Sequence, residues 1–197
     1  MDVYSIVKMN YKNHKQYRLP GYDYSSNGNY FVTICTQNRI NQYLGKISNS
    51  EIYLSGIGKT VDKIWNQIPI EFPGVLLDTY QIMPDHFHAI IRINKTQKRD
   101  LINQIPTFKS GIINNPMELK EKSLGYIIRW FKGKVKYEAG KIEPDFKWQS
   151  RFYERIIRND REFFFIQEYI INNPKNYELE KNPEFEDNEI TNLIKNV

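Results

Sequence analysis

Two strand-like segments separated by a two-residue break constrain the fold more than any other feature of the chain. Residues 75–83, VLLDTYQIM, and residues 86–93, HFHAIIRI, are apolar and rich in β-branched side chains, which is typical of buried strands. Only Pro84 and Asp85 lie between them, whereas parallel strands need a crossover of about a dozen residues or more. We therefore expect the two segments to be antiparallel neighbours in one sheet.

The remaining elements extend this sheet and cover it with helices. Strand patterns recur at residues 30–37 and within 147–158. Apolar residues follow helical spacing at 55–70, 116–139 and 159–172. Asn159 or Asp160 is a suitable N-cap for the last helix, and Asn173-Pro174 is expected to end it. The order β, α, β, β, α, β, α predicts an α+β fold, with helices packed on an antiparallel sheet in a ferredoxin-like arrangement.

We expect one domain, because 197 residues suffice for one sizeable core. It spans residues 1–175, with a polar loop insertion at 94–116, and an acidic tail follows at 176–197. The single cysteine, Cys35, excludes an internal disulfide and is typical of a reducing cytoplasm. No apolar run is long enough to span a membrane, and no apolar leader is present. A cytoplasmic location, associated with the nucleoid, and no membrane partner are therefore expected.

The positive charge is concentrated in one segment. Residues 129–158 hold nine Lys or Arg and four Asp or Glu, an excess that equals the net charge of +5 of the whole chain. Interleaved aromatic residues make this segment suitable for binding phosphates and stacking bases, although a solvated basic helix has the same composition. Trp148 is better explained as a core anchor than as a stacking platform. The candidate DNA contacts are Arg18, Arg129, Lys132, Lys134, Lys136, Trp148, Gln149, Arg151, Arg155 and Arg158.

Two of the chain's three histidines, His86 and His88, stand one residue apart in the segment 86–93. Residues i and i+2 of a strand share a face, so the two imidazoles project together while Phe87 points into the core. Two ligands are too few for a structural zinc site but suit an open divalent-metal site, unless the pair simply makes ordinary hydrogen bonds. Asp85, taken as part of the strand, is expected to face away from His86.

A second pair of polar residues, Tyr169 and Asn173, shares one face of the last helix because the residues are four apart. The Asn173 carbonyl oxygen is a ligand that Mg²⁺ or Mn²⁺ accepts. The Tyr169 phenol becomes a nucleophile when a nearby positive charge or proton acceptor stabilises the phenolate. Taken alone, the same pattern also describes a helix end with a tyrosine in the core. Tyr137 and Tyr153 are competing candidates for a nucleophile.

Four segments in order carry a family resemblance: RLPGYDYSSNGNYFVTICTQNR, MPDHFHAIIRI, KWQSRFYERIIRND and EYIINNP. Together they resemble the HUH single-tyrosine transposases, named for a His-hydrophobic-His motif, and within that IS200-like superfamily the REP-associated tyrosine transposases. The resemblance runs from about Arg18 to about Pro174.

The resemblance implies an HUH endonuclease fold and assigns a role to each motif residue. His86 and His88 would bind a catalytic Mg²⁺ or Mn²⁺, Asn173 would be a further ligand, and Tyr169 would be the nucleophile. The implied activity is cleavage and rejoining of single-stranded DNA through a 5′-phosphotyrosine, at hairpin-containing repetitive sequences. The implied partner is single-stranded or hairpin DNA, and the enzyme would be a monomer or a homodimer.

Two other functions stay open at this point. A domesticated relative could bind structured single strands without cutting them, because the basic aromatic segment would remain useful after the chemistry is lost. A metal-dependent hydrolase or RNA nuclease would instead activate water with the two histidines and leave no protein-linked strand. No third His, Cys or acid stands at ligand spacing from the pair, which disfavours this hydrolase.

Overall fold

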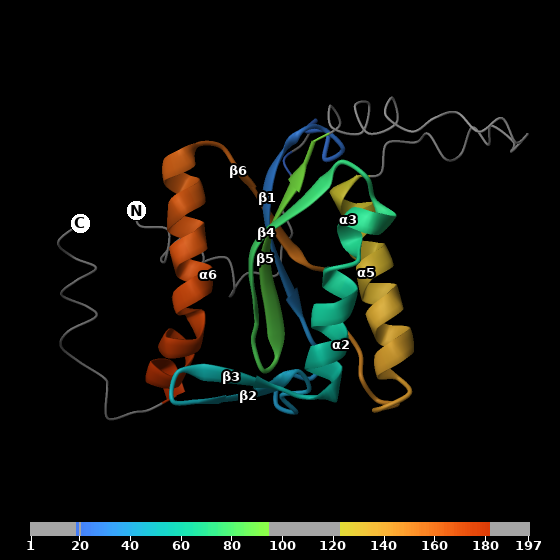
Figure 1. The fold of residues 1–197 in the computed structure, drawn as a ribbon, viewed down its shortest axis with the longest axis vertical. Coiled ribbons are helices and arrows are strands. Elements are labelled where there is room, and N and C mark those ends of the chain that lie inside the picture. The colour runs from blue at the N-terminus through green and yellow to red at the C-terminus, as the bar shows by residue number, and fades with distance from the viewer. Residues whose placement is uncertain (1–18, 20, 95–122, 182–197) are drawn as a thin grey trace, which may run out of the picture.

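The fold is built on a four-stranded sheet with the strand order β4-β5-β1-β6 (Figure 1). The structure is a computed structural model that describes residues 19, 21–94 and 123–181. Every neighbouring pair of strands in this sheet is antiparallel, including β4 with β5, which confirms the predicted pairing. The strands are β1 (Gly28–Cys35), β4 (Val75–Ile82), β5 (His86–Ile93) and β6 (Tyr153–Ile157).

Helices cover both faces of the sheet, as Figure 1 shows. On one face lie α2 (Gly56–Trp65), α3 (Ile68–Glu71) and α5 (Leu124–Ala139), and on the other lies α6 (Asp160–Lys181). An antiparallel sheet with helices packed on it is the α+β fold that the sequence predicted, and this prediction is confirmed. Within the described residues, none of the helices combines the length and the apolar character needed to cross a membrane.

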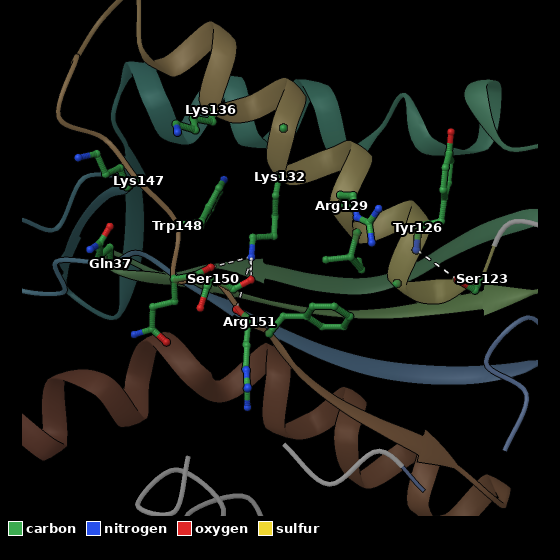
Figure 2. A pocket seen from close by; sticks show the side chains of 15 residues that line it. Gln37, Ser123, Tyr126, Arg129, Lys132, Lys136, Lys147, Trp148, Ser150 and Arg151 are labelled. Atoms are coloured by element: carbon green, nitrogen blue, oxygen red, sulfur yellow. Dashed lines mark hydrogen bonds between the residues drawn. The ribbon is translucent and has the colours of Figure 1, made fainter. Parts of the chain in front are cut away.

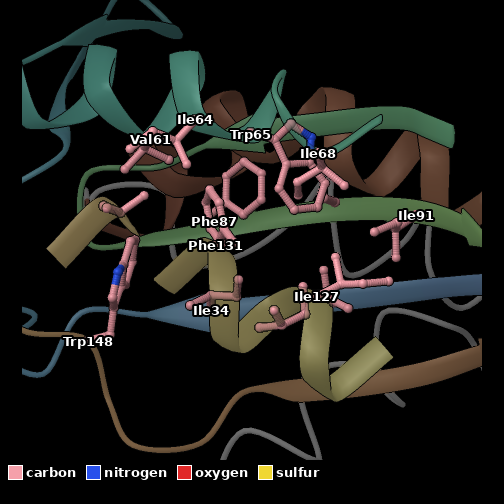
Figure 3. Close-up of a cluster of buried hydrophobic side chains, with 14 of the residues drawn as sticks. Ile34, Val61, Ile64, Trp65, Ile68, Phe87, Ile91, Ile127, Phe131 and Trp148 are labelled. Atoms are coloured by element: carbon pink, nitrogen blue, oxygen red, sulfur yellow. The ribbon is translucent and has the colours of Figure 1, made fainter. Parts of the chain in front are cut away.

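The sheet separates two hydrophobic cores, because alternate residues of a strand face opposite sides. The larger core lies under α2 and α5, where Trp65, Phe87 and Phe131 contact one another (Figure 3). The smaller core lies under α6, and its buried members are Phe31, Ile90, Ile157, Phe163, Ile166 and Ile170. The residues of β5 therefore alternate between the two cores, which decides where the histidines lie.

Several element boundaries differ from the prediction. The helix predicted at 55–70 is divided into α2 and α3, with Pro69 in the first turn of α3. Proline is tolerated in a first turn but clashes inside a helix, so α2 ends before it. A hairpin of β2 (Gly45–Ser48) and β3 (Glu51–Leu54) was not predicted. Its strands are short, and its turn uses positive φ at Asn49 and Ser50 rather than the strongest turn signal, Asn-Gly.

The predicted end of the last helix is wrong. Helix α6 continues through Pro174 to Lys181, so the predicted domain boundary after residue 175 falls inside it. Its predicted start is confirmed, since the Asn159 side chain accepts a hydrogen bond from the Glu162 amide at 2.9 Å. Apart from Asn94, the predicted insertion at 94–116 lies outside the described residues, and so does the tail after Lys181.

Replacing a helical glycine by alanine should change the stability of the fold in opposite directions at Gly58 and at Gly133. A Cβ on Gly58 would collide with the carbonyl oxygen of Leu44, whereas a Cβ on Gly133 would meet no heavy atom within 4 Å. Gly58→Ala should therefore destabilise the fold by about 1–3 kcal/mol through overpacking. Gly133→Ala should stabilise it by about 0.5–1 kcal/mol through helix propensity. Urea unfolding of both variants measures the difference, and equal changes would contradict the close approach of α2 to Leu44.

Candidate functional site

His86 and His88 lie at the start of β5 on the face of the sheet covered by α6. Their exposed fractions are 5% and 1%, and Phe87 between them is buried in the opposite core. The two imidazoles meet through their Nε2 atoms, which are 3.0 Å apart. The predicted orientation of the pair is therefore the one found in the structure.

Each imidazole is held in place through its other ring nitrogen. Nδ1 of His86 lies 2.7 Å from Oδ1 of Asp85, and Nδ1 of His88 lies 2.8 Å from Oγ1 of Thr33. The second carboxylate oxygen of Asp85 accepts a hydrogen bond from Nε of Arg39 at 2.6 Å. The Asp85 carbonyl oxygen in turn accepts hydrogen bonds from both the amide and the hydroxyl of Thr36. Both rings are thus fixed from behind, with their Nε2 atoms facing each other.

The expectation that Asp85 faces away from His86 is wrong. It rested on strand alternation, but β5 begins only at His86, so Asp85 belongs to the turn before the strand. Its side chain therefore does not follow the up-and-down alternation of strand residues, and it lies beside the His86 ring. The sequence feature that indicates this contact is an acidic residue directly before the first histidine, at the end of the Pro84-Asp85 break.

The charges of the buried groups follow from these contacts. Burial raises the pKa of Asp85, but hydrogen bonds and charge from His86 and Arg39 outweigh it and lower that pKa to about 2. Burial, with the charges of His86 and Arg39, holds the pKa of His88 well below its usual value. Near neutral pH, Asp85 is therefore a carboxylate and His88 is a neutral imidazole.

The donor set fits a divalent metal. An ionised carboxylate only accepts hydrogen bonds, so Nδ1 of His86 donates to Asp85, and in the neutral ring Nε2 presents a lone pair. The Thr33 hydroxyl can accept from His88 in the same way, which would leave two facing lone pairs for a cation, whereas a proton on either Nε2 would join the rings by a hydrogen bond. Two nitrogens about 2.1 Å from an ion and about 90° apart are separated by roughly 3.0 Å, which matches the observed distance.

The metal ligands available from the chain are few. Among the described residues, no group of three or more His, Cys, Asp or Glu side chains is gathered for a metal. A site on the two histidines would therefore be completed by a neutral oxygen ligand or by substrate, as in open catalytic sites.

Tyr169 of α6 lies directly above the histidine pair. Its hydroxyl is 3.5 Å from Nε2 of His88, and its ring makes edge contacts with His88 and with Phe31. The neighbouring α6 residues Ile166 and Ile170 are fully buried in the smaller core, which orients this face of the helix toward the sheet. The structure thus brings the tyrosine and both histidines together from segments far apart in the sequence.

Asn173 lies one turn after Tyr169 and is buried. Helix α6 runs antiparallel to β5, because Arg92 lies over Phe163 at one end and His88 contacts Tyr169 further along. The four helix residues from Tyr169 to Asn173 rise about 6 Å, and two strand residues span about 6.6 Å. Asn173 is therefore at the level of His86 along the strand, which suits its predicted role as a further ligand.

The predicted DNA contacts lie in different environments. Arg129, Lys136 and Arg151 are exposed and line a groove on the opposite face of the sheet. Lys132 also lines it, but its ammonium donates to the carbonyl oxygens of Gln149 and Ser150 at 2.7 and 3.1 Å.

Other members of that set lie outside the groove or in the core. Lys134 lies over the ring of Trp130, Arg155 pairs with Glu162, and Arg158 is exposed.

Trp148 is 7% exposed and belongs to the larger core. The backbone amide of Gln149 donates to the Cys35 carbonyl oxygen. Arg18 lies outside the described residues.

The two competing tyrosines are placed less favourably than Tyr169. Tyr137 is 69% exposed on α5, on the far side of the sheet from the histidines. Tyr153 begins β6 and packs its ring on Phe31, on the histidine face but with β1 between its strand and β5.

No family model matches the chain. An uncharacterised protein of Haemophilus influenzae is 37% identical over 167 residues, covering 80% of this chain and 86% of that protein. A second Haemophilus influenzae protein, described as a candidate REP-associated tyrosine transposase, is 26% identical over 153 residues, covering 77% and 73% of the two chains.

One solved structure confirms the fold. It is a REP-associated tyrosine transposase bound to a REP hairpin, and it superposes with a TM-score of 0.54 at 18% identity, covering 83% of this chain and 74% of that one. The ordered motifs, the sheet with its histidine pair facing the helix tyrosine, and the similarity to the second Haemophilus protein agree with one another. The chain is thus similar to REP-associated tyrosine transposases, in sequence to the second Haemophilus protein and in fold to the solved transposase.

Proposed function

We propose that this protein is a metal-dependent single-stranded DNA endonuclease and transposase that cleaves and rejoins DNA through a 5′-phosphotyrosine on Tyr169. One observation carries the proposal, namely that Nε2 of His86, Nε2 of His88 and the Tyr169 hydroxyl converge, with separations of 3.0 and 3.5 Å. The related solved transposase is bound to a REP hairpin, so the substrate proposed here is hairpin-containing repetitive DNA.

His86 and His88 would hold Mg²⁺ or Mn²⁺, with Asn173 as a further ligand. When bound, the ion would polarise a phosphate oxygen and stabilise the charge that develops on it. Asp85 and Thr33 fix the ring orientations, so the two nitrogen ligands are preorganised. Because the histidines are buried and Tyr169 is half-buried, an approaching phosphate meets the phenol on its way to the pair.

In the proposed reaction the Tyr169 oxygen attacks phosphorus and displaces the 3′ oxygen. The products are a DNA 5′ end linked to the tyrosine and a free 3′ hydroxyl. The phosphodiester is exchanged rather than hydrolysed, so no ATP is needed, and attack by a 3′ hydroxyl on the phosphotyrosine rejoins the strands. A preorganised tyrosine lowers the barrier because it converts a bimolecular attack into a step within one complex.

The test uses the full chain and single-stranded oligonucleotides that carry a repetitive hairpin with flanking strands. With Mn²⁺ or Mg²⁺ present, we expect a covalent protein–DNA band that survives denaturation and that contains the fragment on the 3′ side of the cut. EDTA should prevent it. Cleaved DNA without any protein-linked strand would instead indicate a water-activating nuclease, and binding without cleavage would indicate a domesticated binding protein.

Asp85→Asn should weaken metal binding by about 10- to 100-fold, as for other partners of metal-ligating histidines. The amide keeps the shape of the carboxylate but not its charge, so His86 is a poorer ligand and Arg39 loses its ion pair. We expect the Mn²⁺ concentration for half-maximal adduct formation to rise, while activity at saturating Mn²⁺ largely returns.

Asp62→Asn is a matched control, because Asp62 also accepts a side-chain hydrogen bond, from Tyr80 at 2.7 Å, but lies on α2 away from the histidines. The metal requirement of this variant should equal that of the wild type. An unchanged half-maximal Mn²⁺ concentration in Asp85→Asn would show that Asp85 does not position His86 for a metal.

A further inference from the structure

A basic groove of about 990 Å³ lies on the face of the sheet opposite the histidine pair, between α5 and the segment 147–152 (Figure 2). Its charged lining residues are all cations: Arg129, Lys132, Lys136, Lys147 and Arg151. Of the described residues that line it, none is acidic. A surface with this charge pattern suits a phosphate backbone.

The groove is built by the sequence of α5. Arg129, Lys132 and Lys136 are spaced three and four residues apart and so share one helix face. Gly133 lies on the same face, and its missing side chain leaves open space, since a Cβ there would meet no heavy atom within 4 Å. The helix therefore offers room together with positive charge.

Lys132 has a role that differs from that of the other cations. Its ammonium donates to the carbonyl oxygens of Gln149, Ser150 and Arg151 at 2.7, 3.1 and 3.5 Å, and burial lowers its pKa. Figure 2 shows these bonds joining α5 to the segment below it. Lys132 therefore holds α5 against the segment 147–152. The other four cations are exposed and remain available to a ligand: Arg129, Lys136, Lys147 and Arg151.

The floor of the groove leads directly to the proposed active site. After Phe152 the chain enters β6 at Tyr153, which is paired with Thr33 of β1, and Thr33 is paired with His88 of β5. Two strand spacings separate Tyr153 from His88, about 10 Å in all. Tyr153 packs on Phe31, which also contacts His88 and Tyr169. The groove and the site thus meet around the β6 edge of the sheet.

We propose that this groove binds the phosphodiester backbone of the single strand that continues from the cleavage site around the β6 edge. The inference rests on the proposed function, since it assigns a path to the DNA that Tyr169 would cleave. The path must bend around a sheet edge within about 10 Å. Duplex DNA has a persistence length of about 50 nm, so a hairpin stem cannot follow this path, whereas a flexible single strand can.

The test compares two double variants of the full chain that each remove two exposed cations from a helix on this face. Arg129→Ala with Lys136→Ala alters the groove, and Lys59→Ala with Lys63→Ala on α2 is the matched control. Affinities for a hairpin with single-stranded flanks and for the bare hairpin are measured by fluorescence anisotropy over a range of salt concentrations.

For the flanked hairpin, the groove variant should bind about tenfold more weakly or worse, and its log–log salt slope should be shallower by about 1.4, since each single-strand phosphate contact contributes about 0.7. The bare hairpin should bind both double variants alike. An unchanged affinity for the flanked DNA overturns the inference, and so does an equal loss with the bare hairpin, which would place the stem in the groove.

Failure of this inference can be told apart from failure of the proposed function. If the wild-type protein forms the covalent adduct but the groove variant binds flanked DNA normally, only the path of the strand is wrong. If the wild-type protein forms no adduct, the proposed chemistry fails, whatever the groove binds.

Discussion

Tyr169→Phe is expected to abolish the covalent protein–DNA adduct while leaving the fold and hairpin binding intact. The substitution removes one oxygen, the atom proposed to attack phosphorus, and keeps the ring that packs on Phe31 and His88. The hydroxyl contact with His88 is long, at 3.5 Å, so its loss should change the free energy of unfolding by no more than about 1 kcal/mol. Denaturing electrophoresis of the labelled oligonucleotide measures the adduct, and anisotropy measures binding.

Tyr153→Phe and Tyr137→Phe are the matched controls, because they remove the same atom from the two competing tyrosines. Both variants should form the adduct at close to the wild-type rate. Full adduct formation by Tyr169→Phe would refute the assignment of the nucleophile. Loss of the adduct in Tyr153→Phe alone would move that assignment to β6, on the same face of the sheet.

The placement of the histidine pair was predictable because strand alternation is a strong local rule. The segment 86–93 was predicted as a strand, and β5 has those bounds. Burial on both faces explains its almost continuous apolar sequence, since one side lies under α2 and α5 and the other under α6. The polar interruptions on the α6 side, His86 and His88 near the start and Arg92 near the end, were therefore visible as exceptions in a mostly apolar strand.

The contacts around the pair were harder to predict because they depend on turns and on distant segments. Asp85 was misplaced since the alternation of β5 does not extend into the preceding turn. Thr33 lies within β1 and Arg39 lies in the loop that follows it, and no local pattern in the sequence relates them to the histidines. Only the pairing of β1 with β5, with Thr33 opposite His88, brings them together.

The positive charge of the basic segment, residues 129–158, was evident in the sequence. The contacts that each of its cations makes were not. Lys132 is bound by backbone carbonyls, while Arg129 and Lys136, on the same helix face, line the groove with exposed side chains. Trp148 lies in the core because its segment pairs with Thr36 beside β1. Charge counts alone cannot separate structural cations from those available to DNA.

His86→Ala and His88→Ala are each expected to remove metal binding and to slow adduct formation by about 10³-fold. The two imidazoles are the nitrogen ligands of the proposed site, and either one alone leaves an ion held mainly by water. Loss of several kcal/mol of charge stabilisation corresponds to a rate loss of about tenfold for each 1.4 kcal/mol. Metal binding is measured without DNA, as the rise in melting temperature on adding Mn²⁺, because a ligand at about 100 times its Kd stabilises the folded state by about 2.7 kcal/mol.

His14→Ala is the matched control for these variants, because it removes the chain's third histidine, which lies outside the described residues. It should keep the Mn²⁺-dependent rise in melting temperature, whereas both variants of the pair should lose it even where their metal-free stability is close to that of the wild type. The buried position of His88 makes a lower metal-free stability expected for its alanine variant, so the shift on adding Mn²⁺ is the decisive quantity. If that shift persists without His88, the ion binds elsewhere, and the facing Nε2 atoms are joined by a shared proton instead.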